Sequence, residues 1–462
     1  MASSTDTIFM GANDAESIKG RQFSVSTTTP KPFQTTYFPS YEVKVGAYRN
    51  LDIEERPSLM YTIVLGGQHL LASFSACWLL PILMGFDPNT TLFFAGCRVP
   101  SFLGASAAFI APVLSATQFS GPFGSSNPNI AIAQGGIFVT GLVYAAIGLL
   151  IHFFGTKYIK ILMPPLVSGA VVMAIGLNLA GIGINNAASG QDGPWQACLA
   201  IICIGAFAAF GPGFTKQVPI LLGLILSYAI AAIAGKATGR DLDWSVLDNA
   251  EWFAAPKFTT PVFDGNAIAT ILPAVIALLA ENMGHVSSIG AIANRNLDGY
   301  LGRAFLGDAV ATMVSALGGG AGVTTYAENI GTMAVTRVYS TSIFLVAAVF
   351  AILLSFIHKF GGVLRTIPNG IWGGVEIVLF GLIAITGARI WASNRVDLTD
   401  TRNLFIAAVP VILGSGMPSL PGGTLTLGSV KLDGIGMSAI SALVLNFFIW
   451  VIPEALGMSQ KE

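Results

Sequence analysis

Charged residues are scarce in this 462-residue chain. They make up 10% of it, whereas hydrophobic residues make up 53%. Soluble domains carry about 25% charged residues, so a soluble globular protein is excluded. The composition predicts a polytopic membrane protein whose main partner is the lipid bilayer. We expect no nucleic-acid partner.

Cysteines are few, and we expect no cleavable signal peptide. The four cysteines lie in or beside apolar stretches, without the spacing of a disulfide framework or a metal site. We therefore expect no metal and no cofactor. Residues 1–57 are polar, rich in Ser and Thr, and lack an apolar core. This composition predicts a disordered cytoplasmic tail.

Long apolar runs fill the rest of the chain. A spanning helix needs about 20 apolar residues. Spans are predicted near 59–83, 89–97, 103–118, 129–153, 162–184, 196–212, 217–235, 266–290, 304–318, 328–338, 340–357, 369–391, 403–417 and 434–453. Lys and Arg gather in alternate loops, as they do in cytoplasmic loops. The pattern favours an even number of crossings with both termini in the cytoplasm.

Fourteen spans divide into seven plus seven, so the halves have opposite orientations. The third element of each half, within 100–113 and 319–335, begins with small and β-prone residues and then turns helical. Matched interruptions of this kind indicate a transporter's binding site. The predicted fold is an all-α polytopic membrane protein with about 14 transmembrane segments. They form 7+7 inverted repeats, with short strand and half-helix elements in the third and tenth segments.

Ionisable residues inside the apolar runs are rare, so each calls for a role. Glu281 and His285 are four residues apart and share one helix face. They form either a substrate or proton site or a pair that locks two helices. Glu328 falls where an extended segment becomes a half-helix, whose free N–H groups stabilise a carboxylate.

Other polar residues leave more than one interpretation open. His69, beside Gln68, either braces a site or forms a hydrogen bond between helices. Asp308 either supports the ninth element structurally or serves the site. Glu376 is either a bundle salt bridge or a second proton site.

Five motifs in order resemble the nucleobase–ascorbate transporter family, also called nucleobase:cation symporters, over about 58–453. The motifs are Gln68-His69, LGASAAFIAP (103–112), AENMGHV (280–286), the run Glu328-Asn329-Ile330-Gly331-TMAV-Thr336-Arg337, and IPNGIWGGVEIVLFG (367–381). Glu at the start of the fourth motif, with Glu and His in the third, resembles the uracil permease branch.

The resemblance implies a homodimer in the plasma membrane that takes up its substrate with protons by an elevator-like motion. It implies a core domain of spans 1–4 and 8–11 (about 58–158 and 266–358). It also implies a gate domain of spans 5–7 and 12–14 (about 160–236 and 368–453). Residues 454–462 are then a second cytoplasmic tail.

The chemistry of uracil fits these residues. Uracil has two N–H groups, which can donate hydrogen bonds to Glu281 and Glu328. It also has two carbonyls, which can accept from the backbone N–H groups of Ala107 and Glu328. We expect Glu281, His285 and Glu328 to share substrate and proton duties. The resemblance implies that Ala76, Tyr326, Ala327 and Phe380 border the ring. The expected supporting residues are Gln68, His69, Asn329 and Asp308.

Alternatives remain at the level of function. The chain could be a purine, xanthine or urate permease of the same family, an anion transporter of the same architecture, or a non-transporting membrane sensor. No nucleophile–base set or metal cluster predicts an enzyme. The second span is short: nine residues reach about 13 Å, against a bilayer core of about 30 Å.

Overall fold

The computed structural model describes residues 51–93, 100–427 and 430–455, apart from 54, 122 and 241. The predicted tails lie almost wholly outside these residues, as do the last residues of the predicted second span. Within the described ranges, seven helices are long and apolar enough to cross a membrane, or eight if one bent pair counts as a span. The multi-span architecture is thus confirmed, whereas fourteen spans and inverted repeats stay predictions.

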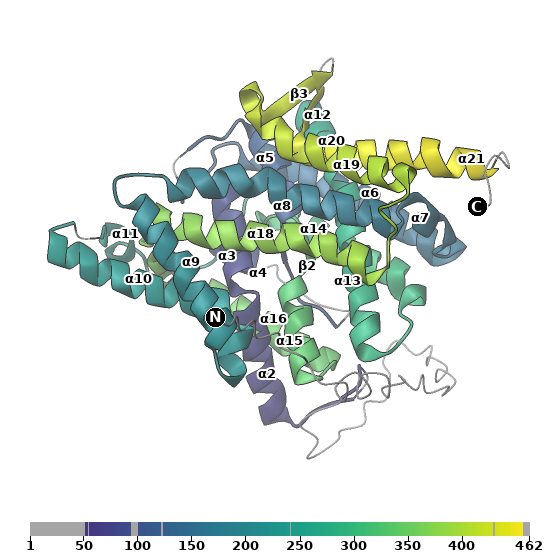
Figure 1. The fold of residues 1–462 in the computed structure, drawn as a ribbon. Helices are drawn as coiled ribbons and strands as arrows, with labels where there is room; N and C mark the ends of the chain where they lie inside the picture. Colours follow the sequence, from purple (N-terminus) through teal and green to yellow (C-terminus); the bar gives the residue numbers. More distant parts are fainter. Residues whose placement is uncertain are drawn as a thin grey trace, which may run out of the picture. The chain divides into compact units, whose positions relative to one another are not determined.

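The first part of the chain is mainly helical (Figure 1). Its elements are α2 (Leu59–Ala72), α3 (Phe74–Met84), α4 (Pro88–Phe93), β1 (Leu103–Ala105), η1 (Ala107–Phe109), α5 (Ile110–Thr117), α6 (Ile130–Phe154), α7 (Lys157–Leu162), α8 (Pro165–Ala187), α9 (Gly193–Phe210), η2 (Gly213–Gln217) and α10 (Pro219–Thr238).

The second part repeats the helix–strand–helix order. Its elements are α11 (Ser245–Asp248), α12 (Gly265–Ile271), α13 (Ala274–Ala293), η3 (Asp298–Tyr300), α14 (Leu301–Gly318), β2 (Val323–Thr325), α15 (Ala327–Thr336), α16 (Thr341–Ser355), α17 (His358–Arg365), α18 (Asn369–Ser393), α19 (Thr401–Gly416), η4 (Met417–Ser419), η5 (Pro421–Gly423), β3 (Thr424–Leu427), β4 (Val430–Asp433), α20 (Gly434–Asn446), the π-helical η6 (Phe447–Val451) and α21 (Ile452–Ala455).

The first predicted span is not one continuous helix. Helices α2 and α3 bend by 40° at Ser73. The Ser73 hydroxyl donates to the carbonyl of His69 at 3.0 Å, and hydroxyls that bond to backbone carbonyls in this way bend helices. The bend changes the direction of the chain between His69 and Ala76.

Two three-residue strands meet and pair in the buried interior, and the place where they meet is called the strand crossing below. β1 pairs antiparallel with β2, with Leu103 opposite Thr325 and Ala105 opposite Val323. Both strands are buried throughout, and each leads into a helix within the segments where the sequence predicts this change. Gly104 permits the approach, because a Cβ there would lie 2.7 Å from the Tyr326 hydroxyl. Extended backbone inside a membrane protein is stable where protein surrounds it.

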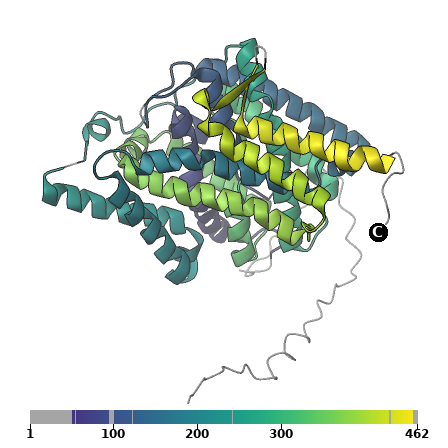
Figure 2. The same cartoon turned by 45° about the horizontal axis from the view of Figure 1, so that its top comes forward.

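Helices from distant parts of the sequence form two packed sets. In one set, α8 contacts α18, α19 and α20, while α9 contacts α10 and α18. Figure 2 shows the yellow α20 lying along the yellow-green α19. In the other set, α6 contacts α14 and α12, and α2 contacts α16. Glycines allow the close packing of α8 on α18: a Cβ at Gly387 would lie 2.5 Å from the Gly169 carbonyl oxygen.

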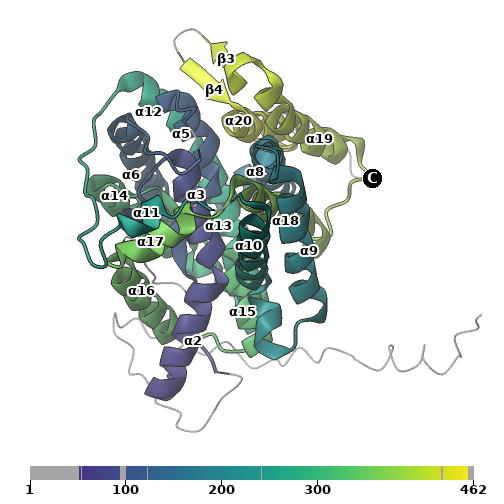
Figure 3. The same cartoon turned by 90° about the vertical axis from the view of Figure 1, so that its left-hand side faces the viewer.

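A β-hairpin precedes α20, where the sequence predicts no regular structure. Strands β3 and β4 pair from Thr424 and Asp433 to Leu427 and Val430, and Figure 3 shows the hairpin beside α20. β4 also contacts α5 and α12. Asp433 ends the hairpin and caps α20 by accepting from the N–H of Ile435 at 2.9 Å.

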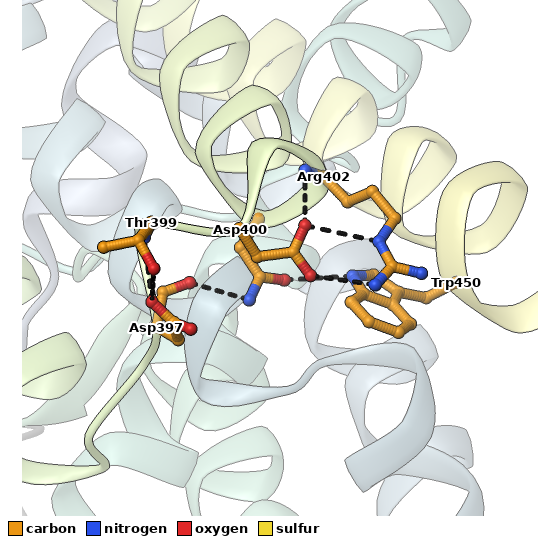
Figure 4. A network of polar contacts seen from close by, with 6 residues as sticks. Asp397, Thr399, Asp400, Arg402 and Trp450 are labelled. Atoms are coloured by element: carbon orange, nitrogen blue, oxygen red, sulfur yellow. Dashed lines mark hydrogen bonds and ion pairs between the residues drawn. The ribbon is translucent and has the colours of Figure 1, made fainter. Parts of the chain in front are cut away.

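A polar network joins the start of α19 to η6, which follows α20 (Figure 4). The Arg402 guanidinium lies 4.2 Å from the centre of the Trp450 ring and pairs with Asp400 at 3.0 Å. The Trp450 indole donates to Asn403 at 3.0 Å. Hydrogen bonds from Arg402 hold the pKa of the Asp400 carboxyl below its usual value.

Candidate functional site

Most of the predicted site residues lie on the helices that contact or directly follow the paired strands. Helix α13 contacts β2, α15 and η1, while α3 contacts β1 and α5. His285 on α13 is held by β2, since its Nδ1 lies 2.6 Å from the Thr325 hydroxyl. The predicted shared face of Glu281 and His285 therefore points at the strand that leads into α15.

A buried network lies behind this face. Asn282 donates its amide to the Tyr144 hydroxyl at 2.8 Å and also to the carboxylate of Asp308. The Thr325 hydroxyl reaches the Asn282 carbonyl oxygen at 3.5 Å. Asp308 thus supports α13 from behind. Sequence reasoning missed Asn282 and Tyr144; the signal for Asn282 is an amide directly after Glu281 in an apolar run.

Glu281 has an unsatisfied oxygen. Its Oε2 and the hydroxyl of Thr324 on β2 are both buried without a hydrogen-bond partner of normal geometry in the described part of the chain, and the two groups lie close enough to interact with each other. Glu281 also lies within electrostatic range of Glu328. Buried polar atoms are normally hydrogen-bonded, so these unsatisfied atoms mark a place where a polar ligand can bind.

Glu328 lies in the first turn of α15, as predicted for a half-helix start. Tyr326 fixes this turn: its hydroxyl donates to the Ala105 carbonyl at 2.8 Å, and its N–H donates to the Phe102 carbonyl at 3.2 Å. The N–H groups of a first turn have no partner within the helix. Ala327 and Glu328 therefore present both N–H donors and a carboxylate beside β1.

His69 and Asn329 join α2 to α15. The Asn329 amide donates to His69 Nδ1 at 3.0 Å and to the His69 carbonyl at 2.9 Å. Since Nδ1 accepts, the imidazole proton lies on Nε2, and the ring lies 4.6 Å from that of Phe344. His69 therefore forms a hydrogen bond between elements, one of the two roles considered from the sequence. Gln68 turns to η2 and donates its amide to Gln217.

The small residues predicted at the site are buried on the first half-helix and on α3. Ala107 opens η1, where the Ser106 hydroxyl caps the turn by accepting from the N–H of Ala108 at 3.2 Å. Ala76 is buried on α3, one residue before Cys77. The Cys77 thiol would lie 2.9 Å from a Cβ at Gly104, so α3 closes one side of the strand crossing.

Two predicted residues lie on α18, in the other set of helices. Phe380 is buried. Its helix packs closely on α8, since a Cβ added at Gly176 would lie 2.4 Å from the Phe380 carbonyl oxygen. Glu376 is also buried, and both its oxygens accept from the Asn186 amide, at 2.8 and 3.1 Å. The partner of Glu376 is thus an amide, and the salt bridge considered from the sequence is not the contact formed.

The family model described as the Permease family matches residues 60–423. RutG of Escherichia coli K12, named as a candidate pyrimidine permease, is 46% identical over 88% of this chain and 94% of its own. The uracil permease of Bacillus caldolyticus is 36% identical over 88% of this chain and 96% of its own. The uracil permease of E. coli K12 is 34% identical over 90% of this chain and 98% of its own.

Solved structures share the fold at low sequence identity. Murine Slc26a9, an anion transporter captured facing inward, aligns with a TM-score of 0.63 at 9% identity, over 99% of this chain and 78% of its own. The transmembrane domain of the cyanobacterial bicarbonate transporter BicA aligns with a TM-score of 0.54 at 14% identity, over 83% of this chain and 96% of its own.

The family match covers most of the chain, and the relatives align over nearly their whole length. Three of the motifs that carried the resemblance, 103–112, 280–286 and the run from Glu328, also lie on or beside the paired strands. The chain therefore belongs to the nucleobase–ascorbate transporter family, in its uracil permease-like branch, and is a multi-pass membrane transporter.

Proposed function

We propose that this protein imports uracil across the plasma membrane by proton symport. The observation that carries the proposal is the pair of unsatisfied polar groups at the strand crossing, Glu281 Oε2 and the Thr324 hydroxyl. A carboxylate buried without a partner is costly. A ligand with N–H donors removes that cost, and uracil carries two such donors and two carbonyls.

The proposed arrangement uses both carboxylates and the half-helix starts. Glu281 accepts an N–H of the ring, and Glu328 accepts at another edge or orients the first turn of α15. The N–H groups at Ala107 and Glu328 donate to the carbonyls. Ala76, Tyr326, Ala327 and Phe380 border the ring, while Gln68, His69, Asn329 and Asp308 support the site. The relatives named uracil permeases favour this substrate.

Proton coupling follows from the same residues. Glu281 and Glu328 are close enough to interact, so binding of one proton reduces their mutual repulsion. His285, held by Thr325, completes the group that shares the proton. Their titrations are coupled, so the proton belongs to the group and not to one residue.

Movement of one helix set against the other would carry the site across the membrane. The packing of α9, α10, α18 and α19 on one another and on α8 supports a gate domain, and the packing of α6 on α14 and of α2 on α16 supports a core domain, with α13 contacting α8 and α20 between the two sets. We propose an elevator-like motion of the core within a homodimer, with both termini in the cytoplasm.

A purine, xanthine or urate substrate is the second candidate. The small side chain of Ala107 favours it, since an alanine at the half-helix start leaves more room in the pocket than an aromatic residue. Glu328 argues the other way, because Glu at this position of the motif resembles the uracil permease branch. A non-transporting sensor is the third candidate, in line with the short second span.

The test is uptake of labelled uracil into proteoliposomes under an inward proton gradient. Unlabelled uracil, xanthine and urate serve as competitors, and a protonophore collapses the gradient as the control. Gradient-dependent uptake blocked by uracil alone supports the proposal. Competition by xanthine or urate supports the second candidate instead. A folded protein that takes up no uracil supports the third.

A further inference from the structure

A cavity of ≈ 350 Å³ is lined by Glu328 and by residues from both helix sets. Four residues of α15 line one wall: Glu328, Gly331, Thr332 and Val335. Their spacing of three, four and seven residues is that of a single helix face. The opposite wall is built from η2 and the first turn of α10. The cavity therefore follows α15 from the site toward Arg337. Arg337 belongs to the alternate loops rich in Lys and Arg, which the sequence predicts to be cytoplasmic.

One cation and one carboxylate line this cavity. The cation is Lys216 on η2, which is exposed, and the carboxylate is Glu328 on α15. The next residue, Gln217, is bonded to Gln68 of α2. This contact fixes the end of η2 against the core side, so Lys216 is held near the mouth of the cavity. The ion pairs found among the described residues do not join Lys216 to Glu328, and both residues line the same cavity.

The other ionisable groups near Glu328 do not attract a negative charge. They are Glu281 from α13, Cys77 from α3 and Tyr326 at the start of α15. The remaining residues of η2, α10 and α18 that line the cavity are uncharged. Lys216 is therefore the one cation among the described residues that line this cavity, and a cation near a carboxyl group favours its ionised form.

We propose that Lys216 promotes release of the transported proton from Glu328 into the cytoplasm. This inference rests on the proposed function, because it assigns a residue to one step of symport. Lys216 belongs to the set that contains α10, and Glu328 to the set that moves in the elevator-like motion. The cation therefore acts on Glu328 when the core faces inward and loses its effect when the core moves outward. Glu328 then gives up its proton inside and binds a new one outside. Lys216 is a positioning residue for proton release and does not touch the substrate.

The test compares net uptake with exchange in proteoliposomes of the full chain. Net uptake into empty vesicles requires proton release at every cycle. Exchange of labelled for unlabelled uracil proceeds with the proton still bound. Both are measured over a range of internal pH for the wild type, Lys216→Gln, Lys216→Arg and Lys236→Gln. Lys236 is the matched control, because it is an exposed lysine at the far end of α10.

We expect Lys216→Gln to lower net uptake about fivefold relative to exchange, the upper end for a partly exposed charge pair. Inhibition of net uptake by internal protons should begin at a proton concentration about fivefold lower, since no cation then opposes protonation of Glu328. Lys216→Arg and Lys236→Gln should behave like the wild type. Retained exchange shows that the variant is folded.

Three results would overturn the inference. The first is an unchanged ratio of net uptake to exchange in Lys216→Gln. The second is an equal loss of both activities, which assigns Lys216 to movement or folding. The third is a Lys216→Arg variant that fails like Lys216→Gln, which shows that shape and not charge matters. If the wild type itself shows neither activity with uracil, the proposed function fails first, and the inference fails with it.

Discussion

The two strand–helix segments share a backbone plan but differ in their chemistry. β1 with η1 and α5 carries no ionisable side chain, and its turn is capped by Ser106. β2 with α15 carries Glu328 and Asn329 in its first turn and contacts α13 through Thr325. The first segment thus contributes shape and backbone donors, while the second contributes charge. A repeated geometry does not require a repeated function.

The largest effect should come from Glu281→Gln, a change on α13, the helix that contacts the second segment. The neutral amide cannot offer a charged acceptor toward β2, so uracil binding should weaken about 100-fold, the range for hydrogen bonds to charged groups. Equilibrium binding of labelled uracil measures it. Glu251→Gln, at an exposed position, is the matched control, and wild-type affinity in Glu281→Gln would remove Glu281 from the site.

Glu328→Gln should change selectivity more than it changes stability. The amide keeps the shape of the first turn of α15 but loses the carboxylate, so uracil binding should weaken about tenfold or preference should move toward purines. Competition of uracil and xanthine for labelled uracil uptake distinguishes these results. Unaltered affinity and unaltered selectivity together would mean that the charge of the second segment has no role in recognition.

His285→Ala should alter the pH dependence of uptake, because it removes the imidazole held against Thr325. The pH profile of uptake in proteoliposomes is the measurement. His152→Ala provides the comparison, since His152 is exposed near the end of α6. A profile that matches the wild type would count against a proton role for His285.

Gly104→Ala tests the first segment through its backbone. The added methyl group would meet the Tyr326 ring at 2.8 Å and the Cys77 thiol at 2.9 Å. Overpacking of this kind costs about 1–3 kcal/mol, so thermal unfolding should begin at a lower temperature. Gly307→Ala is the control, because a Cβ at Gly307 has open space around it. Equal stability of the two variants would show that the strands can separate without cost.

Ser106→Ala should give the smallest effect. It removes the hydroxyl that accepts from the Ala108 N–H, and the loss of a helix cap costs about 1 kcal/mol. Stability should fall slightly, while the preference between uracil and xanthine should stay as in the wild type. A change in that preference would give the first segment a direct role in selecting the substrate.

Local sequence patterns predicted most helices and which ionisable residues they carry. Apolar runs placed helices such as α6 and α18 within a few residues of their observed ends. The spacing of Glu281 and His285 placed both on one face, and the change in composition near Glu328 placed a half-helix start there. These predictions succeed because helix formation and side-chain periodicity depend on neighbours within one or two turns.

Contacts between distant residues were beyond such patterns. Asn329 meets His69 across 260 positions of the chain, and Asn282 meets Tyr144 across 138. The hairpin of β3 and β4, the bend at Ser73 and the bond between Gln68 and Gln217 were not predicted either. The pairing partner of a three-residue strand cannot be read from its own residues, since strand stability comes from packing and pairing with other elements.

The sequence by itself determined that the chain is a helical membrane transporter, which family it belongs to, and which few polar residues its apolar helices carry. The tertiary structure decided which of those residues meet. It placed Glu281 and Thr324 with unsatisfied atoms beside the strand crossing, and it paired Glu376 with Asn186. The reason is physical: burial of an apolar residue follows from its own chemistry, whereas a buried polar group is stable only with a partner that the whole fold supplies.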